Sequence, residues 1–176
     1  MTRAVRLAVS RLERDRERAS PAYVKLLRSV STNESEDVER FVDANIFNYL
    51  IGGTDAHAKN YSLLLGASRQ VRLSPLYDLS TQLPYVDRIP QRVAMKIGRR
   101  YDIGSITSAD WQSLARHCKL DEAQMVDRVR ALAEMLPDHI AAARDQALQQ
   151  KLRSSPIRKA SELMLKHVRA RREALG

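Results

Sequence analysis

The chain has 176 residues, and 30 Lys and Arg against 21 Asp and Glu give it a net charge of +9. Hydrophobic residues make up 44% and charged residues 29%, which excludes a disordered tail or a fibrous repeat. Apolar runs are short, as at Leu63–Leu65, whereas a bilayer span needs about 20 apolar residues. We therefore expect one compact domain without a membrane span, whose positive surface attracts nucleic acid, phosphorylated ligands or an acidic protein.

The N-terminus and the cysteine content predict a cytoplasmic protein. Residues Met1–Arg6 are basic, but charged residues follow them where a secretory signal would be apolar. Cys118 is the only cysteine, so no internal disulfide can form, and a zinc site would rest mainly on four scattered histidines.

The first half of the chain favours helix, because Gly and Pro are few, at six each. Apolar residues at helical spacing predict one helix around residues 5–12 and a second that begins at Ser20-Pro21. The clearest helical period runs from Val38 to Leu50 and ends at Gly52-Gly53.

The middle of the chain changes character. Residues 61–65 and 71–74 flank the glycine-containing connection Gly66–Gln70, which predicts a short β-hairpin. Residues 75–106 contain several prolines and glycines and show no sustained period, so we expect a long irregular segment of the kind that often carries function.

Helices are expected again in the last third. Thr107–Asp110 resembles a capping box and predicts a helix over 108–118, and Asp121 with Gln124 predicts a second start and a helix over 121–136. Pro137 predicts a new helix to about residue 151, and Ser155-Pro156 begins the last one. That final helix is rich in Lys and Arg, which fits either a solvated basic face or a binding surface.

The stretch from Gly52 to Asn60 carries the most chemical information. It joins a predicted helix to a predicted strand, and it holds Asp55 and Asn60 five residues apart. Asp78 follows the hairpin, 23 residues after Asp55 (78 − 55). Two carboxylates and an amide oxygen form a hard-oxygen set that suits Mg²⁺ and phosphoryl transfer. Such residues also cap helices and close turns, which is the structural alternative.

The residues of this region, and not only their spacing, resemble those of a known family. Residues 47–62 read FNYLIGGTDAHAKNYS and residues 73–80 read LSPLYDLS, and together with 93–98 and 106–111 they resemble the core of HipA-type toxin kinases. The resemblance implies a serine/threonine kinase fold related to protein and lipid kinases. The chain would supply its helical C-terminal lobe, a mainly α (α+β) fold with one short β-hairpin next to the catalytic loop.

The resemblance also assigns roles to site residues. Asp55 matches the catalytic base, and Asn60 and Asp78 match the ligands of Mg²⁺ bound with ATP. His57 is interpreted as the residue that organises the catalytic loop. The alternative is that His57 contacts a phosphate directly. Lys59 either faces the ATP phosphates or is solvated.

Several other residues are given no role in the candidate site. Three basic residues contact a phosphate, an acidic substrate surface or only water: Lys96, Arg99 and Arg100. Relatives often have glycine and polar residues at positions 99 and 100, so no family role is transferred to these two arginines. Trp111 is expected in the core, and Cys118 as a small buried hydrophobe. The remaining histidines show no metal-ligand spacing. They are His117, His139 and His167.

A complete kinase of this type also covers ATP with a Gly-rich loop and a strand lysine. The 54 residues before Asp55 read as helices, so we expect a C-terminal lobe that is a fragment, one half of a split kinase or a remnant. The expected segments are a helical extension over 1–19, the kinase lobe over 20–152 and a basic helix over 153–176.

Three functions follow. The first is the kinase toxin of a toxin–antitoxin pair, which in this family phosphorylates an aminoacyl-tRNA synthetase and pairs with a HipB-like helix-turn-helix antitoxin that contacts DNA. The second is a non-catalytic lobe that docks an antitoxin, DNA or a separate N-lobe protein. The third, ranked last, is a metal-dependent phosphohydrolase using Asp55, His57 and Asp78.

Overall fold

A computed structural model describes residues 19–85, 87, 91–150, 152 and 154–176. The helix predicted around residues 5–12, and with it nearly all of the predicted N-terminal extension, lies outside the described residues.

Two helices open the described part, as the sequence predicted. They are α2 (Ala19–Val30) and α3 (Glu34–Ile51). Their apolar faces meet at Tyr23 and Phe41, whose rings stack with centroids 4.7 Å apart. Helix α3 ends at Gly52, which adopts the left-handed backbone conformation (φ 69°) that favours glycine.

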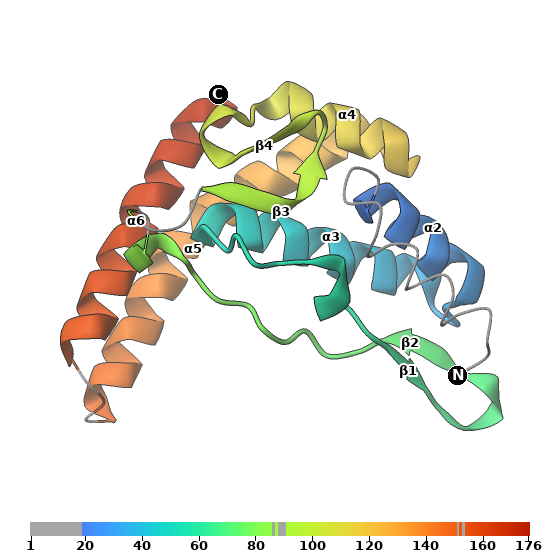
Figure 1. The fold of residues 1–176 in the computed structure, drawn as a ribbon, viewed down its shortest axis with the longest axis horizontal. Coiled ribbons are helices and arrows are strands. Elements are labelled where there is room, and N and C mark those ends of the chain that lie inside the picture. The colour runs from blue at the N-terminus through green and yellow to red at the C-terminus, as the bar shows by residue number, and fades with distance from the viewer. Residues whose placement is uncertain (1–18, 86, 88–90, 151, 153) are drawn as a thin grey trace.

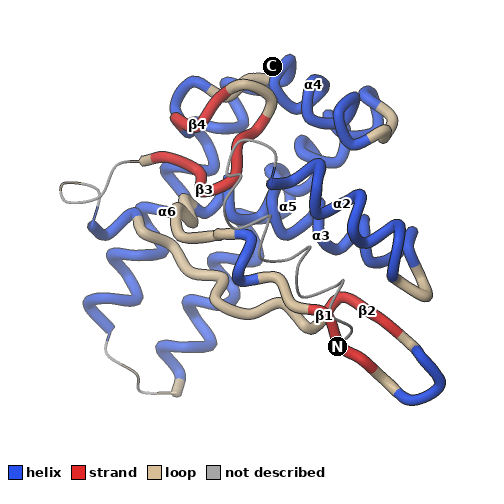
Figure 2. Tube along the Cα trace, turned by 45° about the vertical axis from the view of Figure 1, so that its right-hand side comes forward, coloured by secondary structure: helices blue, strands red, loops and turns tan. Residues whose placement is uncertain are grey.

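The predicted β-hairpin is confirmed. Strands β1 (Leu63–Leu65) and β2 (Val71–Leu73) pair antiparallel, with Leu63 opposite Leu73. Figures 1 and 2 show this hairpin reaching away from the helices.

A second hairpin, β3 (Arg92–Ile97) with β4 (Arg100–Asp102), follows within the segment predicted to be irregular. That prediction was therefore wrong over residues 92–102. The strand forms because Val93, Met95 and Ile97 alternate with less buried residues and enter the core. Nearby prolines and glycines had concealed this short alternation.

Three helices complete the fold: α4 (Ser108–Cys118), α5 (Glu122–Gln149) and α6 (Ser154–Leu175). The capping box at Thr107 is present, and the Asp121 carboxylate accepts a hydrogen bond from the Gln124 amide at 2.8 Å.

The break predicted at Pro137 was wrong, because α5 continues through it. Proline inside a helix costs about 3 kcal/mol through its missing N–H and its clash with the preceding turn. The buried stripe of α5 is unbroken across this point, and its packing against α6 outweighs that cost. The stripe consists of Met125, Val126, Val129, Ala133, Leu136 and Ile140.

The core lies around α3, which packs against α2, α5 and α6 (Figures 1 and 2). Trp111 is fully buried, as predicted, and its ring meets Tyr49 edge-on at 5.4 Å. The mainly α architecture with small antiparallel strand pairs is confirmed. None of the described helices is long and apolar enough to cross a membrane.

Candidate active site

The loop between α3 and β1 begins with two close contacts that fix its path. The Gly53 N–H donates to the Asn48 carbonyl at 2.7 Å, and a Cβ at Gly53 would lie 2.5 Å from Asn48 Oδ1. A side chain at position 53 would therefore collide with α3. The Asn48 side-chain amide also donates to the Tyr61 hydroxyl at 3.4 Å, so one residue of α3 contacts both ends of the loop.

The far end of the loop is held by buried tyrosines. The Tyr23 hydroxyl donates to the Tyr61 carbonyl at 2.8 Å, and the Tyr61 ring meets Phe41 edge-on at 4.8 Å. Burial raises the pKa of Tyr61 to about 12, so its hydroxyl stays neutral and remains an anchor. The short 3-10 turn Ala58–Asn60 is thereby fixed just before β1.

Asn60 joins the predicted base to the predicted metal ligand. Its side-chain amide donates to the Asp55 carbonyl and to Asp78 Oδ2, each at 3.0 Å. Asn60 is buried, whereas Asp55 and Asp78 are exposed. The structure thus joins Asp78, which follows the hairpin, to the loop of Asp55 and Asn60, and it leaves both aspartates exposed.

His57 and Lys59 lie in the same loop but differ in their contacts. His57 Nε2 lies 3.1 Å from Asp55 Oδ1, and the Asp55 side chain is 58% exposed. His57 thus contacts the Asp55 carboxylate, and its role as a loop-organising residue stays a prediction. The Lys59 side chain is exposed, and only its carbonyl contributes here, by accepting a hydrogen bond from Tyr77 at 3.2 Å. A phosphate contact for Lys59 remains a prediction.

The β1–β2 hairpin is anchored by Asp37, which sequence reasoning missed. This fully buried carboxylate accepts hydrogen bonds from the Leu73 amide at 2.8 Å, the Ser31 hydroxyl at 2.6 Å and the Arg72 guanidinium at 3.1 Å. Burial alone would raise the pKa of Asp37, but these hydrogen bonds outweigh it and hold the pKa below its ordinary value. In the sequence Asp37 stands just before the helical period that begins at Val38, which marks it as no more than an ordinary helix-end residue.

Tyr77 was missed as well, and it fixes the backbone just before Asp78. Its hydroxyl donates to the Lys59 carbonyl and lies 2.8 Å from the Ser62 hydroxyl, which therefore acts as the donor. Asp78 itself adopts a left-handed backbone (φ 57°), a conformation that Asp tolerates better than most residues. The segment after β2 is thus tied to the loop that carries Asp55.

The donor atoms fit the predicted Mg²⁺. Because the Asn60 amide nitrogen is engaged with Asp55 and Asp78, its Oδ1 remains available beside the Asp78 carboxylate. Mg²⁺ prefers one or two protein oxygens together with water and phosphate oxygens. Among the described residues, no group of three or more His, Cys, Asp or Glu could hold a metal, which gives the phosphohydrolase hypothesis no support.

The other singled-out residues have structural roles. Cys118 is buried, which confirms the predicted small hydrophobe, and this burial raises the pKa of its thiol to about 12. His167 Nε2 donates to the Tyr49 carbonyl at 3.1 Å, and burial lowers the His167 pKa.

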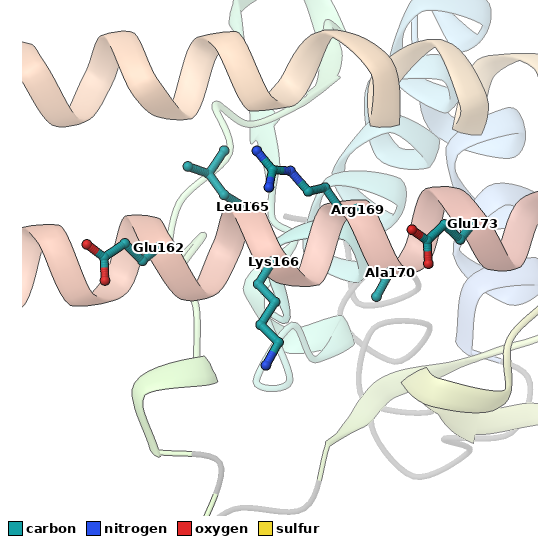
Figure 3. A pocket seen from close by; sticks show the side chains of 6 residues that line it. All are labelled: Glu162, Leu165, Lys166, Arg169, Ala170 and Glu173. Carbon is teal, nitrogen blue, oxygen red and sulfur yellow. The ribbon is translucent and has the colours of Figure 1, made fainter.

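The basic last helix also carries acidic residues. A shallow pocket along α6 is lined by Lys166 and Arg169 but also by Glu162 and Glu173 (Figure 3). The mixed charges fit the solvated-face reading better than a dedicated surface for a polyanion.

Comparison with known proteins identifies the family. The family model of the HipA-like C-terminal domain matches residues 6–140 of this chain. The chain belongs to this family. In the sequence comparison, "Putative kinase Y4mE" of Sinorhizobium fredii is 33% identical over 117 residues, 66% of this chain and 27% of that protein. The serine/threonine-protein kinase toxin HipA of Shewanella oneidensis is 31% identical over 96 residues, 54% of this chain and 22% of that protein.

A solved structure shares the fold. The complex of Shewanella oneidensis HipA with HipB and its operator DNA contains a chain that matches 88% of this chain with a TM-score of 0.69 and 20% identity. This chain covers 37% of that protein and about a quarter of the length of the curated relatives.

Proposed function

We propose that this HipA-like domain is the C-terminal lobe of a serine/threonine protein kinase, which transfers the γ-phosphate of ATP to a protein hydroxyl. The observation that carries the proposal is the bridging amide of Asn60, which holds both Asp55 and Asp78 at 3.0 Å. The kinase names of the sequence relatives support it.

The geometry suggests a division of labour. Asp55 is exposed, so its carboxylate can accept the proton of a substrate hydroxyl as the hydroxyl oxygen bonds to the γ-phosphorus and the bond to ADP breaks. His57, 3.1 Å away, holds that carboxylate in place. Asn60 and Asp78 present the oxygen atoms that would hold Mg²⁺. The ion would neutralise charge on the β- and γ-phosphates.

The nucleotide also needs groups that were not recognised in this sequence. We propose that a β-rich N-lobe with a Gly-rich loop and a strand lysine joins this lobe when ATP binds, either in the same polypeptide or as a separate protein. The relatives are roughly four times as long as the matched region, which supports this proposal.

The test is phosphate transfer from labelled ATP to protein in a cell extract, by the full gene product with its N-lobe. Asp55→Asn should lower the transfer rate at least about 100-fold while leaving Mg²⁺ binding intact. Asp78→Asn should weaken both Mg²⁺ binding and transfer. Asp138→Asn, at an exposed position on α5, is the matched control and should change neither. Full activity of Asp55→Asn would refute the kinase proposal.

A HipB-like helix-turn-helix antitoxin is the proposed partner, supported by the fold shared with a HipA solved together with HipB and operator DNA. DNA would then be contacted through the antitoxin. A gel shift of operator DNA with the antitoxin alone, this chain alone and both together tests this arrangement. If Asp55→Asn kept both the cellular effect and antitoxin binding, the non-catalytic docking lobe would be the better description.

A further inference from the structure

The β3–β4 hairpin carries a basic pocket whose lining includes none of Asp55, Asn60 and Asp78. It is open to solvent and has a volume of about 790 Å³. Three arginines line it, and all three side chains are exposed. The lining residues are Gln91, Arg92, Arg99, Arg100, Tyr101, Asp102 and Ser105.

The two faces of β3 explain why the charges gather here. Val93, Met95 and Ile97 point into the core, so Arg92 and Lys96 emerge on the opposite face. Both cations lie over the Tyr101 ring, with Arg92 Cζ at 5.2 Å and Lys96 Nζ at 5.7 Å from its centre.

The positive charge of the pocket is only partly compensated. Arg100 Nε lies 3.9 Å from Asp110, and the Asp102 carboxylate accepts a hydrogen bond from the Gly104 amide. Within the described part of the chain, neither Arg92 nor Arg99 forms an ion pair with a carboxylate. Two guanidinium groups are therefore available to an anion.

The strand that carries the pocket contacts the loop of the candidate active site through its opposite, buried face. The buried face of β3 shares a small cavity with Asn48, Gly53 and Ala56, so the strand packs against the loop that carries Asp55. The turn after β3 is held against α4, because a Cβ at Gly98 would lie 2.7 Å from the Asp110 carbonyl. A group bound in the pocket would thus occupy a defined position relative to the loop.

We propose that this pocket binds the phosphate of a phosphorylated serine or threonine on a protein that docks on the β3–β4 hairpin. Guanidinium groups match phosphate oxygens in charge and geometry, and a phosphoserine carries close to two negative charges. Arg92 and Arg99 supply the complementary charges.

A nucleic acid fits the pocket less well. Nucleic-acid surfaces spread their cations over many phosphates, whereas these arginines line one pocket together with the carboxylate of Asp102. The Tyr101 ring is already engaged with two cations, which disfavours base stacking.

The test measures binding and does not depend on kinase activity. The full chain is titrated with a peptide pool that has a central phosphoserine and mixed flanking residues, and with the same pool carrying serine. Fluorescence anisotropy should show at least about ten-fold tighter binding of the phosphorylated pool. In wild-type protein, the arginine side-chain NMR signals of Arg92 and Arg99 should shift on addition of that pool.

Variants locate the interaction. The double variant Arg92→Gln/Arg99→Gln should lose the preference for phosphoserine, while Arg158→Gln, at an exposed position on α6, should keep it. Circular dichroism checks that both variants are folded, and the wild-type NMR shifts remain decisive if the double variant is not.

Several results would overturn the proposal. Equal affinity for the two peptide pools would exclude phosphate recognition, and unshifted Arg92 and Arg99 signals would exclude this pocket. Inorganic phosphate binding as tightly as the phosphorylated pool would exclude a protein-borne ligand. Duplex DNA that binds through the same arginines, in the absence of a phosphoserine preference, would assign the pocket to nucleic acid.

Discussion

The two hairpins are similar in size but are held to the helices by different interactions. In β1–β2 the leucines Leu64 and Leu65 are 52% and 46% exposed, and the buried carboxylate of Asp37 joins the hairpin to α3. In β3–β4 the side chains of Met95 and Ile97 are buried in the core. A two-stranded hairpin is marginally stable by itself, so each depends on its attachment.

The kind of attachment affects how accurately each hairpin places the residues on it or next to it. Hydrogen bonds to a buried carboxylate are directional, whereas apolar burial is not. The directional anchor belongs to the hairpin that leads to Asp78, where a ligand must be placed accurately. The apolar anchor belongs to the hairpin that presents long, adaptable arginine side chains.

The sharpest test of the polar anchor is Asp37→Ala. The free energy of unfolding should fall by about 3 kcal/mol, because the Leu73 amide and Ser31 lose a buried acceptor. Urea denaturation measures the loss, and hydrogen exchange should show faster exchange in β2 first. Glu39→Ala, at an exposed position on α3, is the control. A change within about 0.5 kcal/mol of wild type would show that the carboxylate is not the anchor.

The apolar anchor is tested by Met95→Ala. Met95 is 4% exposed, and its truncation should cost about 2–3 kcal/mol. Hydrogen exchange should increase in β3 and β4 rather than in β1 and β2. The control is Met135→Ala on α5, where the methionine is 48% exposed and its loss should be nearly neutral. Loss of protection in both hairpins together would contradict separate anchoring.

Low pH should weaken the Asp37 anchor of β1–β2, and we expect this effect on stability to be smaller than that of either substitution above. Because the pKa of Asp37 is lowered in the folded protein, its contribution is complete above its unfolded pKa near 3.8 and is lost as the pH falls through the folded-state value. Stability measured against pH should therefore decline below about pH 4 more steeply in wild type than in Asp37→Asn. Parallel curves for the two proteins would contradict the assignment.

The smallest expected effect is that of Tyr77→Phe. It removes the hydrogen bond to the Lys59 carbonyl and should cost about 0.5–1 kcal/mol, with weaker Mg²⁺ binding because Asp78 is less firmly placed. Thermal melting and Mg²⁺ titration measure the two effects. The Tyr85 hydroxyl forms no hydrogen bond with the described residues, so Tyr85→Phe should leave both values unchanged.

The sequence predicted the parts of this fold that local rules decide. The helical period before Gly52, the capping box at Thr107 and the first hairpin all depend on neighbouring residues, and all three are confirmed. The convergence of Asp55, Asn60 and Asp78 was predicted from a motif, and the bridging role of the Asn60 amide needed the structure.

Features that depend on distant partners were not predictable in the same way. The 28-residue α5 continues through Pro137 and packs against α6, and no local pattern around Pro137 indicates this packing. Asp37 and Leu73 are 36 residues apart, and nothing in either local sequence indicates that the carboxylate accepts the strand amide.

Helix α6 has a practical consequence for anyone who makes shorter versions of this protein. The family match ends at residue 140, but the Leu175 carbonyl accepts a hydrogen bond from Ser108 on α4, and Arg171 donates to the Ile103 carbonyl. A clone cut at the family boundary would lose α6 and the end of α5, and the apolar residues that they cover would face water and invite aggregation. The unit that folds extends past the unit that sequence similarity recognises.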